Sequence, residues 1–195
     1  ALGGYDPSKL SFTVIGEGQI KSDSSIPQLT DLSLSRNVIN RDEDEDHLLL
    51  SFKATDQTGF SYANFNFKRI KEDGSFDRDN NERISMDDWN SLTIGGSEND
   101  GSYVGLLQLS SNSQEGKYEL ESFYISDEAD NYKYYSINTS TVNNVITKSW
   151  EKEAKEALGG YDPSKLSFTV IGEGQIKSDS SIPQLTDLSL SRNVI

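Results

Sequence analysis

Carboxylate side chains are the groups in this sequence whose positions could support chemistry. The chain carries 32 acidic and 18 basic residues, a formal net charge of −14. Such a surface attracts cations and repels nucleic acid and anionic membranes. Ca²⁺ is held by about six to eight oxygen ligands, usually gathered from loops. Six acidic residues in turn-forming segments are therefore predicted Ca²⁺ ligands: Asp23, Asp56, Asp127, Glu128, Asp130 and Asp179. The alternative is that these residues only form ordinary turns.

A second candidate metal site has the spacing Asp77-x-Asp79-x-Asn81, with Asp88 at the twelfth position counted from Asp77. This spacing partly matches an EF-hand loop, but Glu82 stands where the sharp turn needs glycine. A solvated polar hairpin over residues 71–83 is the alternative for the same segment.

Other acidic positions are interpreted as structural. The run 42–46 is five carboxylates in a row, which is typical of a solvated edge. Asp6 and its copy Asp162 lie in Gly-Tyr-Asp-Pro, where capping a turn is the expected role.

Two residue types limit the possible functions. The chain has no cysteine and one histidine, His47. Disulfides, thiolate metal sites and thiol nucleophiles are therefore excluded, and histidine-based triads and zinc sites nearly so. Carboxylates are numerous enough for acid–base hydrolysis, but their spacing singles out no pair. We expect no enzyme activity, and we expect His47 at the end of a strand.

The loops that carry these carboxylates lie between segments with the alternating pattern of β-strands. In residues 47–55, for example, Leu48, Leu50, Phe52 and Ala54 share one face. Similar patterns predict strands over residues 9–15, 29–35, 60–70, 102–109, 117–126, 132–137 and 165–171. Residues 84–94 are expected to form a strand with a short helical turn. One helix is predicted over residues 149–158, ended by Gly159-Gly160. The alternation slips after Leu120, which predicts a bulge near Glu121.

Many short strands with frequent turns and little helix indicate an all-β protein. We predict an antiparallel immunoglobulin-like β-sandwich with one short helical insertion, and a β-barrel is the alternative. Gly116-x-Tyr118 resembles the tyrosine corner of such sandwiches, in which a tyrosine bonds back to the preceding turn.

The sequence also contains an internal repeat. Residues 1–39 and 157–195 are identical, an offset of 157 − 1 = 156 residues. We interpret the chain as one period of a longer tandem array. Predicted boundaries are a complete domain at 26–174, the last strand of the preceding repeat at 1–20, and the first strand of the following repeat at 183–195. We expect these end strands to pair tail to head between neighbouring molecules. The alternative is that the first copy of the repeat docks on the central sandwich of the same molecule.

Residues 23–39, 52–67, 116–131 and 168–174 are four segments that together resemble the immunoglobulin-like repeats of bacterial surface adhesins. DSSIPQLTDLSLSRNVI (residues 23–39) is similar to their connector and first strand, and FKATDQTGFSYANFNF (52–67) to a strand ending in a T-D-x-x-G loop. GKYELESFYISDEADN (116–131) matches a late strand ending in D-x-A-x-N, and FTVIGEG (168–174) the closing strand. The likeness covers most of the period, and the helical segment 150–160 departs from it.

The resemblance implies an extender region of a large RTX-type adhesin, secreted and exposed on the bacterial cell surface. In that family, long arrays hold ligand-binding tips away from the cell, and Ca²⁺ binds in and between domains. The expected partners are adjacent identical repeats, without nucleic acid, direct membrane contact or a small-molecule substrate. The alternative function is a ligand-binding or carbohydrate-binding module that uses exposed aromatic residues such as Tyr132, Tyr134 and Tyr135. A shallow cleft lined by aromatic side chains would favour that alternative.

Overall fold

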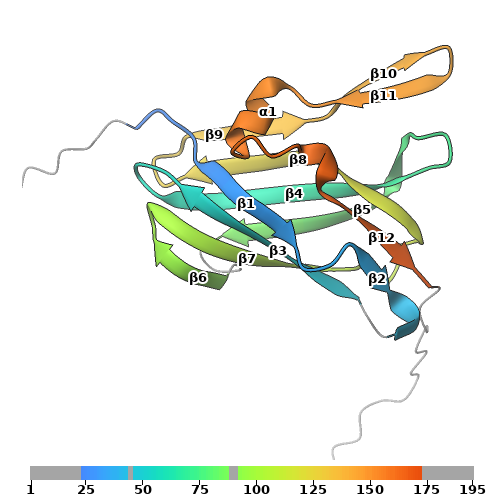
Figure 1. Cartoon of the computed structure of the whole chain (residues 1–195), viewed down its shortest axis with the longest axis horizontal. Coiled ribbons are helices and arrows are strands. Elements are labelled where there is room, and N and C mark those ends of the chain that lie inside the picture. Colours follow the sequence, from blue (N-terminus) through green and yellow to red (C-terminus); the bar gives the residue numbers. More distant parts are fainter. Residues whose placement is uncertain (1–22, 44–45, 88–91, 173–195) are drawn as a thin grey trace, which may run out of the picture.

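The computed structural model describes residues 23–172, apart from 44–45 and 88–91, and these form two packed β-sheets (Figure 1). The smaller sheet has the strand order β1 (Gln28–Leu34), β3 (His47–Thr55), β7 (Asp100–Gln108) and β6 (Leu92–Ser97). The larger sheet has the order β2 (Val38–Asn40), β12 (Ser167–Ile171), β8 (Gly116–Asp127), β4 (Phe60–Ile70) and β5 (Phe76–Asp87), and β9 (Tyr132–Ser136) pairs with β8.

This arrangement confirms the predicted all-β sandwich. In immunoglobulin-type sandwiches, strands A-B-E-D form one sheet and strands G-F-C form the other. The two sheets here have the same orders, β1-β3-β7-β6 and β12-β8-β4. The described strands pair antiparallel except β2 with β12, which are parallel. Because the two sheets are separate and open, the alternative of a closed barrel is wrong.

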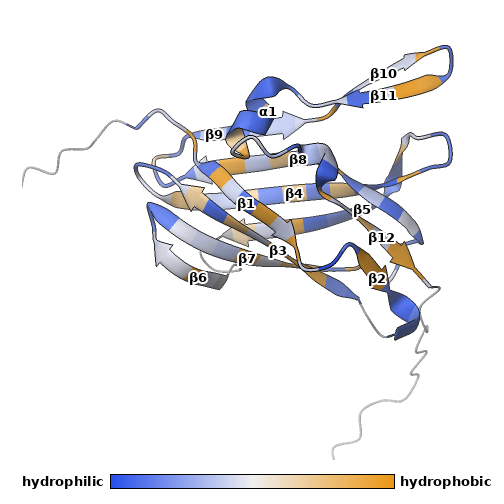
Figure 2. Ribbon diagram, in the orientation of Figure 1, coloured by the Kyte–Doolittle hydropathy of each residue, from blue (hydrophilic) through white to orange (hydrophobic). Residues whose placement is uncertain are grey.

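The core lies between the sheets and follows from the alternation of side chains along each strand. On β3, Leu48, Leu50, Phe52 and Ala54 are buried as predicted, while the residues between them face outward. Figure 2 shows the same alternation as orange and blue bands along the strands. His47 is the first residue of β3 and is exposed, as expected.

The predicted bulge at Glu121 is confirmed. In the pairing of β4 with β8, Asn66 faces Ser122 and Phe67 faces Leu120, so Glu121 is the extra residue. The bulge divides one edge of β8 between two partners. β12 pairs with residues 116–119 and β9 with residues 122–126.

The tyrosine corner is also confirmed. The Tyr118 hydroxyl donates to the Gln114 carbonyl at 2.9 Å and accepts from the Gln114 backbone nitrogen at 3.2 Å. The side chain is fully buried, and its ring stacks on Phe168 with centroids 5.1 Å apart. Burial raises the pKa of this hydroxyl, so it stays protonated and able to donate.

We expect Tyr118→Phe to lower the free energy of unfolding by about 1–3 kcal/mol, because both polar groups of Gln114 lose their partner while the ring contact remains. Urea unfolding measures this change. Tyr124→Phe, which alters a half-buried tyrosine on the outward face of the same strand, is the matched control. Equal stability of the two variants would contradict the prediction.

An insertion separates β8 from β12. After β9 it contains the hairpin β10 (Asn138–Val142) and β11 (Val145–Ser149), then α1 (Lys152–Ala157) and the short 3-10 turn Pro163–Lys165. The hairpin stands away from the two sheets (Figure 1). Trp150 is 8% exposed and contacts Phe123, with ring centroids 5.6 Å apart, so the helix is anchored on the core. No helix in the described part of the chain is long and apolar enough to cross a membrane.

Several predicted elements need correction. The helix is shorter than predicted, and the strand predicted over 84–94 is divided between the end of β5 and β6. The polar hairpin predicted over 71–83 is present but begins differently, because residues 71–75 form the turn and residues 76–87 form β5, which pairs with β4. Pairing with β4 stabilises this polar strand, and its composition alone does not reveal that pairing. The strands predicted at 9–15 and at both chain ends lie outside the described residues.

Candidate metal centre

Strand pairing brings three distant segments to one end of the sandwich. β4 runs antiparallel to β8, with Phe60 opposite Asp127, so the loop before β4 lies beside the end of β8. β1 runs antiparallel to β3, with Gln28 opposite Thr55, so the segment before β1 reaches the same loop.

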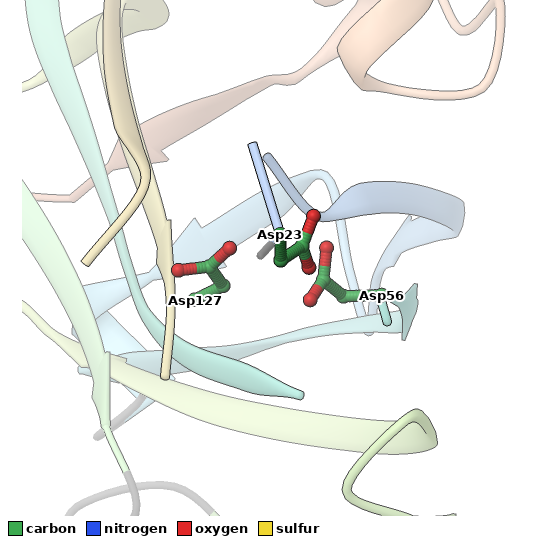
Figure 3. Close-up of side chains that lie close together, drawn as sticks. All are labelled: Asp23, Asp56 and Asp127. Carbon is green, nitrogen blue, oxygen red and sulfur yellow. The ribbon is translucent and has the colours of Figure 1, made fainter. Parts of the chain in front are cut away.

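Three aspartates meet there: Asp23 before β1, Asp56 in the β3–β4 loop and Asp127 at the end of β8. One carboxylate oxygen from each lies within 4.8 Å of the others. Figure 3 shows the three carboxylates pointing toward one another. Asp127 is 2% exposed, and Asp23 and Asp56 are half-buried. We call these three residues the aspartate cluster.

The β3–β4 loop is shaped by the Asp56 side chain. Its Oδ1 accepts hydrogen bonds from the backbone nitrogens of Thr58 at 2.8 Å and Gly59 at 3.1 Å. Gly59 has φ +110°, a conformation that favours glycine. The neighbouring β6–β7 turn supports the loop, since the Asn99 side chain donates to the Gln57 carbonyl at 2.7 Å. Asp56 is therefore held in a defined position.

The loop after β8 is shaped in the same way by Asp127. Its Oδ1 accepts from the backbone nitrogens of Ala129 at 2.9 Å and Asn131 at 2.7 Å, and its Oδ2 accepts from Asn131 Nδ2 at 2.7 Å. Asn131 Nδ2 also donates to the Asp23 carbonyl at 3.1 Å. Asn131 therefore joins the segment before β1 to this loop.

Thr58 makes a second connection within the aspartate cluster. Its hydroxyl lies 3.1 Å from Asp23 Oδ2 and 3.0 Å from Asp56 Oδ1 and can donate to either. The sequence prediction did not include Thr58 or Asn131 among the site residues. The signal that could have found them is their spacing after an aspartate, which is typical of side-chain-capped turns.

The aspartate cluster concentrates negative charge. Hydrogen bonds from the side chain and backbone of Ser25 are the main cause that lowers the pKa of Asp23 to about 2. Burial raises the pKa of Asp56, and the charge of Asp23 adds to this, while bonds from Thr58 and Gly59 act in the opposite direction. The ion pairs seen between described residues involve other carboxylates. A bound cation would relieve this repulsion.

The donor set suits a hard cation. All three side chains offer carboxylate oxygen, without the nitrogen or sulfur that zinc sites commonly use. Backbone carbonyls or water would complete the coordination. Cavity size and ligand number decide between Ca²⁺ and Mg²⁺ at such a site.

Two further residues predicted for this site lie apart from the aspartate cluster. Glu128 and Asp130 follow Asp127 but are exposed and lie outside the cluster. Asp179 lies outside the described residues. The connector aspartate that meets the two loops is Asp23, because β1 begins at this end of the sandwich and β12 runs toward the other.

The EF-hand-like loop predicted from Asp77, Asp79, Asn81 and Asp88 is not formed. Asp77, Asp79 and Asn81 lie on β5, and Asp88 is outside the described residues. The Arg69 guanidinium pairs with Asp77 at 2.7 Å and lowers the pKa of that carboxyl. The extended strand places Asp79 and Asn81 in solvent, so these side chains form no loop around a shared ion.

The structural role predicted for Asp162 is confirmed. Asp162 precedes the 3-10 turn Pro163–Lys165, and its Oδ1 accepts from the Ser164 backbone nitrogen at 3.2 Å. Its copy Asp6 lies outside the described residues, as does part of the run 42–46.

Comparison with known proteins found no match: no family model, curated protein or solved structure fits this chain.

Proposed function

We propose that this chain is a structural extender repeat of a secreted bacterial surface adhesin, stiffened by Ca²⁺. The observation that carries the proposal is the position of Asp23. This residue belongs to the segment that leads into the domain, yet its carboxylate lies with those of Asp56 and Asp127 from two loops of the domain. A cation held there would tie the leading segment to the body of the sandwich.

The two ends of the sandwich support an end-to-end array. The described chain begins beside the aspartate cluster and leaves at the opposite end (Figure 1). Strand direction is the reason, since β12 is antiparallel to β8 and Val170 lies opposite Gly116, at the start of β8. Repeats joined in this way would each add length along one direction.

The internal repeat extends the argument to the next domain. Asp179 stands in the second copy where Asp23 stands in the first, since 179 − 156 = 23. In an array, Asp179 would therefore meet the counterparts of Asp56 and Asp127 in the following repeat. Each such ion would remove freedom from one connector, and its loss would restore carboxylate repulsion.

Location would control the state of the array. Extracellular Ca²⁺-binding modules typically have Kd values of about 10⁻⁴–10⁻³ M. Sites of that affinity stay empty in a cytosol poor in Ca²⁺ and fill outside the cell. The array would then stiffen only after secretion, with neighbouring identical repeats as its partners.

The test uses a chain with two complete domains, made by continuing the sequence after Ile195 with a second copy of residues 40–172. With Ca²⁺, we expect small-angle X-ray scattering to show one extended shape. With a chelator, we expect a broader distribution of distances between the two domains, because the connector is released.

The control replaces only the second domain's counterparts of Asp56 and Asp127 by asparagine. This variant should scatter in Ca²⁺ as the unaltered two-domain chain does in chelator. Scattering curves that are identical with and without Ca²⁺ would reject the proposed function.

A further inference from the structure

The outward face of the larger sheet carries a group of tyrosines. Side chains alternate along β4, β8 and β9, and the inward set is buried in the core. The outward set forms two adjacent rows across β9, β8 and β4: Tyr134–Tyr124–Asn64 and Tyr132–Ser126–Tyr62.

These tyrosine rings lie close together and are accessible. The ring centroids of Tyr62 and Tyr124 are 5.8 Å apart, as are those of Tyr124 and Tyr132. Tyr132 is 68% exposed and Tyr134 59%. Tyr62 and Tyr124 are half-buried beside them. Aromatic rings gathered on a protein surface are typical of binding sites.

The same face is hollowed into an open groove of about 580 Å³, lined by Tyr62, Asn64, Arg83, Tyr124, Ser126 and Tyr134. This volume is in the range of small-ligand sites, about 300–1,000 Å³. We call it the tyrosine groove. It shares no residue with the aspartate cluster.

Polar groups are placed among the tyrosine rings. Asn64 is 9% exposed, and its Nδ2 donates to Ser85 Oγ at 2.8 Å and to the Ile84 carbonyl at 3.3 Å. These bonds hold the amide in place and leave Oδ1 as an acceptor. Arg83 brings a guanidinium with several N–H donors, and Ser126 brings a hydroxyl. The tyrosine groove therefore combines apolar ring surface with fixed donors and acceptors.

We propose that the tyrosine groove binds a neutral pyranose oligosaccharide. A pyranose offers an apolar C–H surface that packs on aromatic rings and a rim of hydroxyls that bond to amide, guanidinium and hydroxyl groups. The net charge of −14 disfavours anionic polysaccharides. An apolar peptide would cover Arg83, Ser126 and the Asn64 Oδ1 without offering them hydrogen-bond partners, which is costly.

This site corrects the aromatic set expected from the sequence. Tyr135 is 6% exposed and packs on Phe123 with centroids 4.8 Å apart, so it faces the core and not a ligand. Tyr62 and Tyr124 take its place, because pairing of β4 with β8 brings them to the outward face.

The test titrates the full chain with cellohexaose, laminarihexaose and mannohexaose while backbone amides are followed by NMR. We expect at least one of these sugars to shift the amides of residues 122–126 and 132–136 saturably. Tyr134→Ala should then weaken binding about tenfold or more, as expected for the loss of a stacked ring. Leu106→Ala on the other sheet, where the residue is 53% exposed against 59% for Tyr134, should leave binding unchanged.

Binding of the sugar to the tyrosine groove should persist in a chelator. This titration can therefore succeed or fail independently of the Ca²⁺ proposal. The inference is overturned if none of the three sugars gives a saturable shift, or if Tyr134→Ala binds as the unaltered chain does. Self-association that disappears in Tyr134→Ala would also overturn it, by assigning this face to contact between copies.

Discussion

Excess Ca²⁺ is expected to raise the melting temperature of the chain by about 5–10 °C over its value in a chelator. A ligand that binds only the folded state at about 100 times its Kd adds about 2.7 kcal/mol of stability. For a chain of this size, each kcal/mol moves the melting temperature by about 2–4 °C. Ca²⁺ would also remove the repulsion within the aspartate cluster. Thermal unfolding followed by circular dichroism measures the shift.

The variant Asp56→Asn is the sharpest check of this mechanism. Asparagine can still accept the turn bonds from Thr58 and Gly59, so the loop should persist. It removes a charge that burial and Asp23 disfavour, so stability in chelator should not fall, while the Ca²⁺ shift should largely disappear. Asp79→Asn, an exposed change on β5, should keep the full shift.

Mg²⁺ provides the ion control. It demands near-ideal octahedral geometry and releases water reluctantly, so it should raise the melting temperature less than Ca²⁺ does. The same melting temperature in Ca²⁺ and in chelator would reject the aspartate cluster as a Ca²⁺ site.

Removal of β12 should abolish cooperative folding. We expect residues 23–172 to unfold in one transition and residues 23–165 to show none. Phe168 and Val170 are buried in the core, and β12 is hydrogen-bonded to both β8 and β2. Loss of a buried phenylalanine side chain alone costs about 3–5 kcal/mol, against a typical total stability of about 5–15 kcal/mol.

A peptide of residues 164–174 provides the complementary test. Added to the chain 23–165, it should restore the transition by filling the place of β12. Both chains begin at Asp23 because residues 11–15 have the same sequence as β12 and could fill that place themselves. Cooperative unfolding of 23–165 without the peptide would show that β12 is dispensable.

The sequence determined the features that depend on local order along the chain. Alternation of apolar residues in 47–55 predicted β3, and its slip after Leu120 predicted the bulge at Glu121. The Gly116-x-Tyr118 motif predicted the tyrosine corner. Each of these depends on residues within about one strand and turn, where side-chain period and turn chemistry dominate.

Only the tertiary structure decided which distant groups meet. Of the five predicted ligands that it describes, it brought Asp23, Asp56 and Asp127 together and left Glu128 and Asp130 in solvent. It turned the polar segment after residue 75 into β5, and it placed Tyr62 and Tyr124, rather than Tyr135, in an outward groove. The physical reason is strand pairing. Which strands pair, and in what register, depends on burial across the whole sandwich, and a shift of one residue would reverse the face of every side chain.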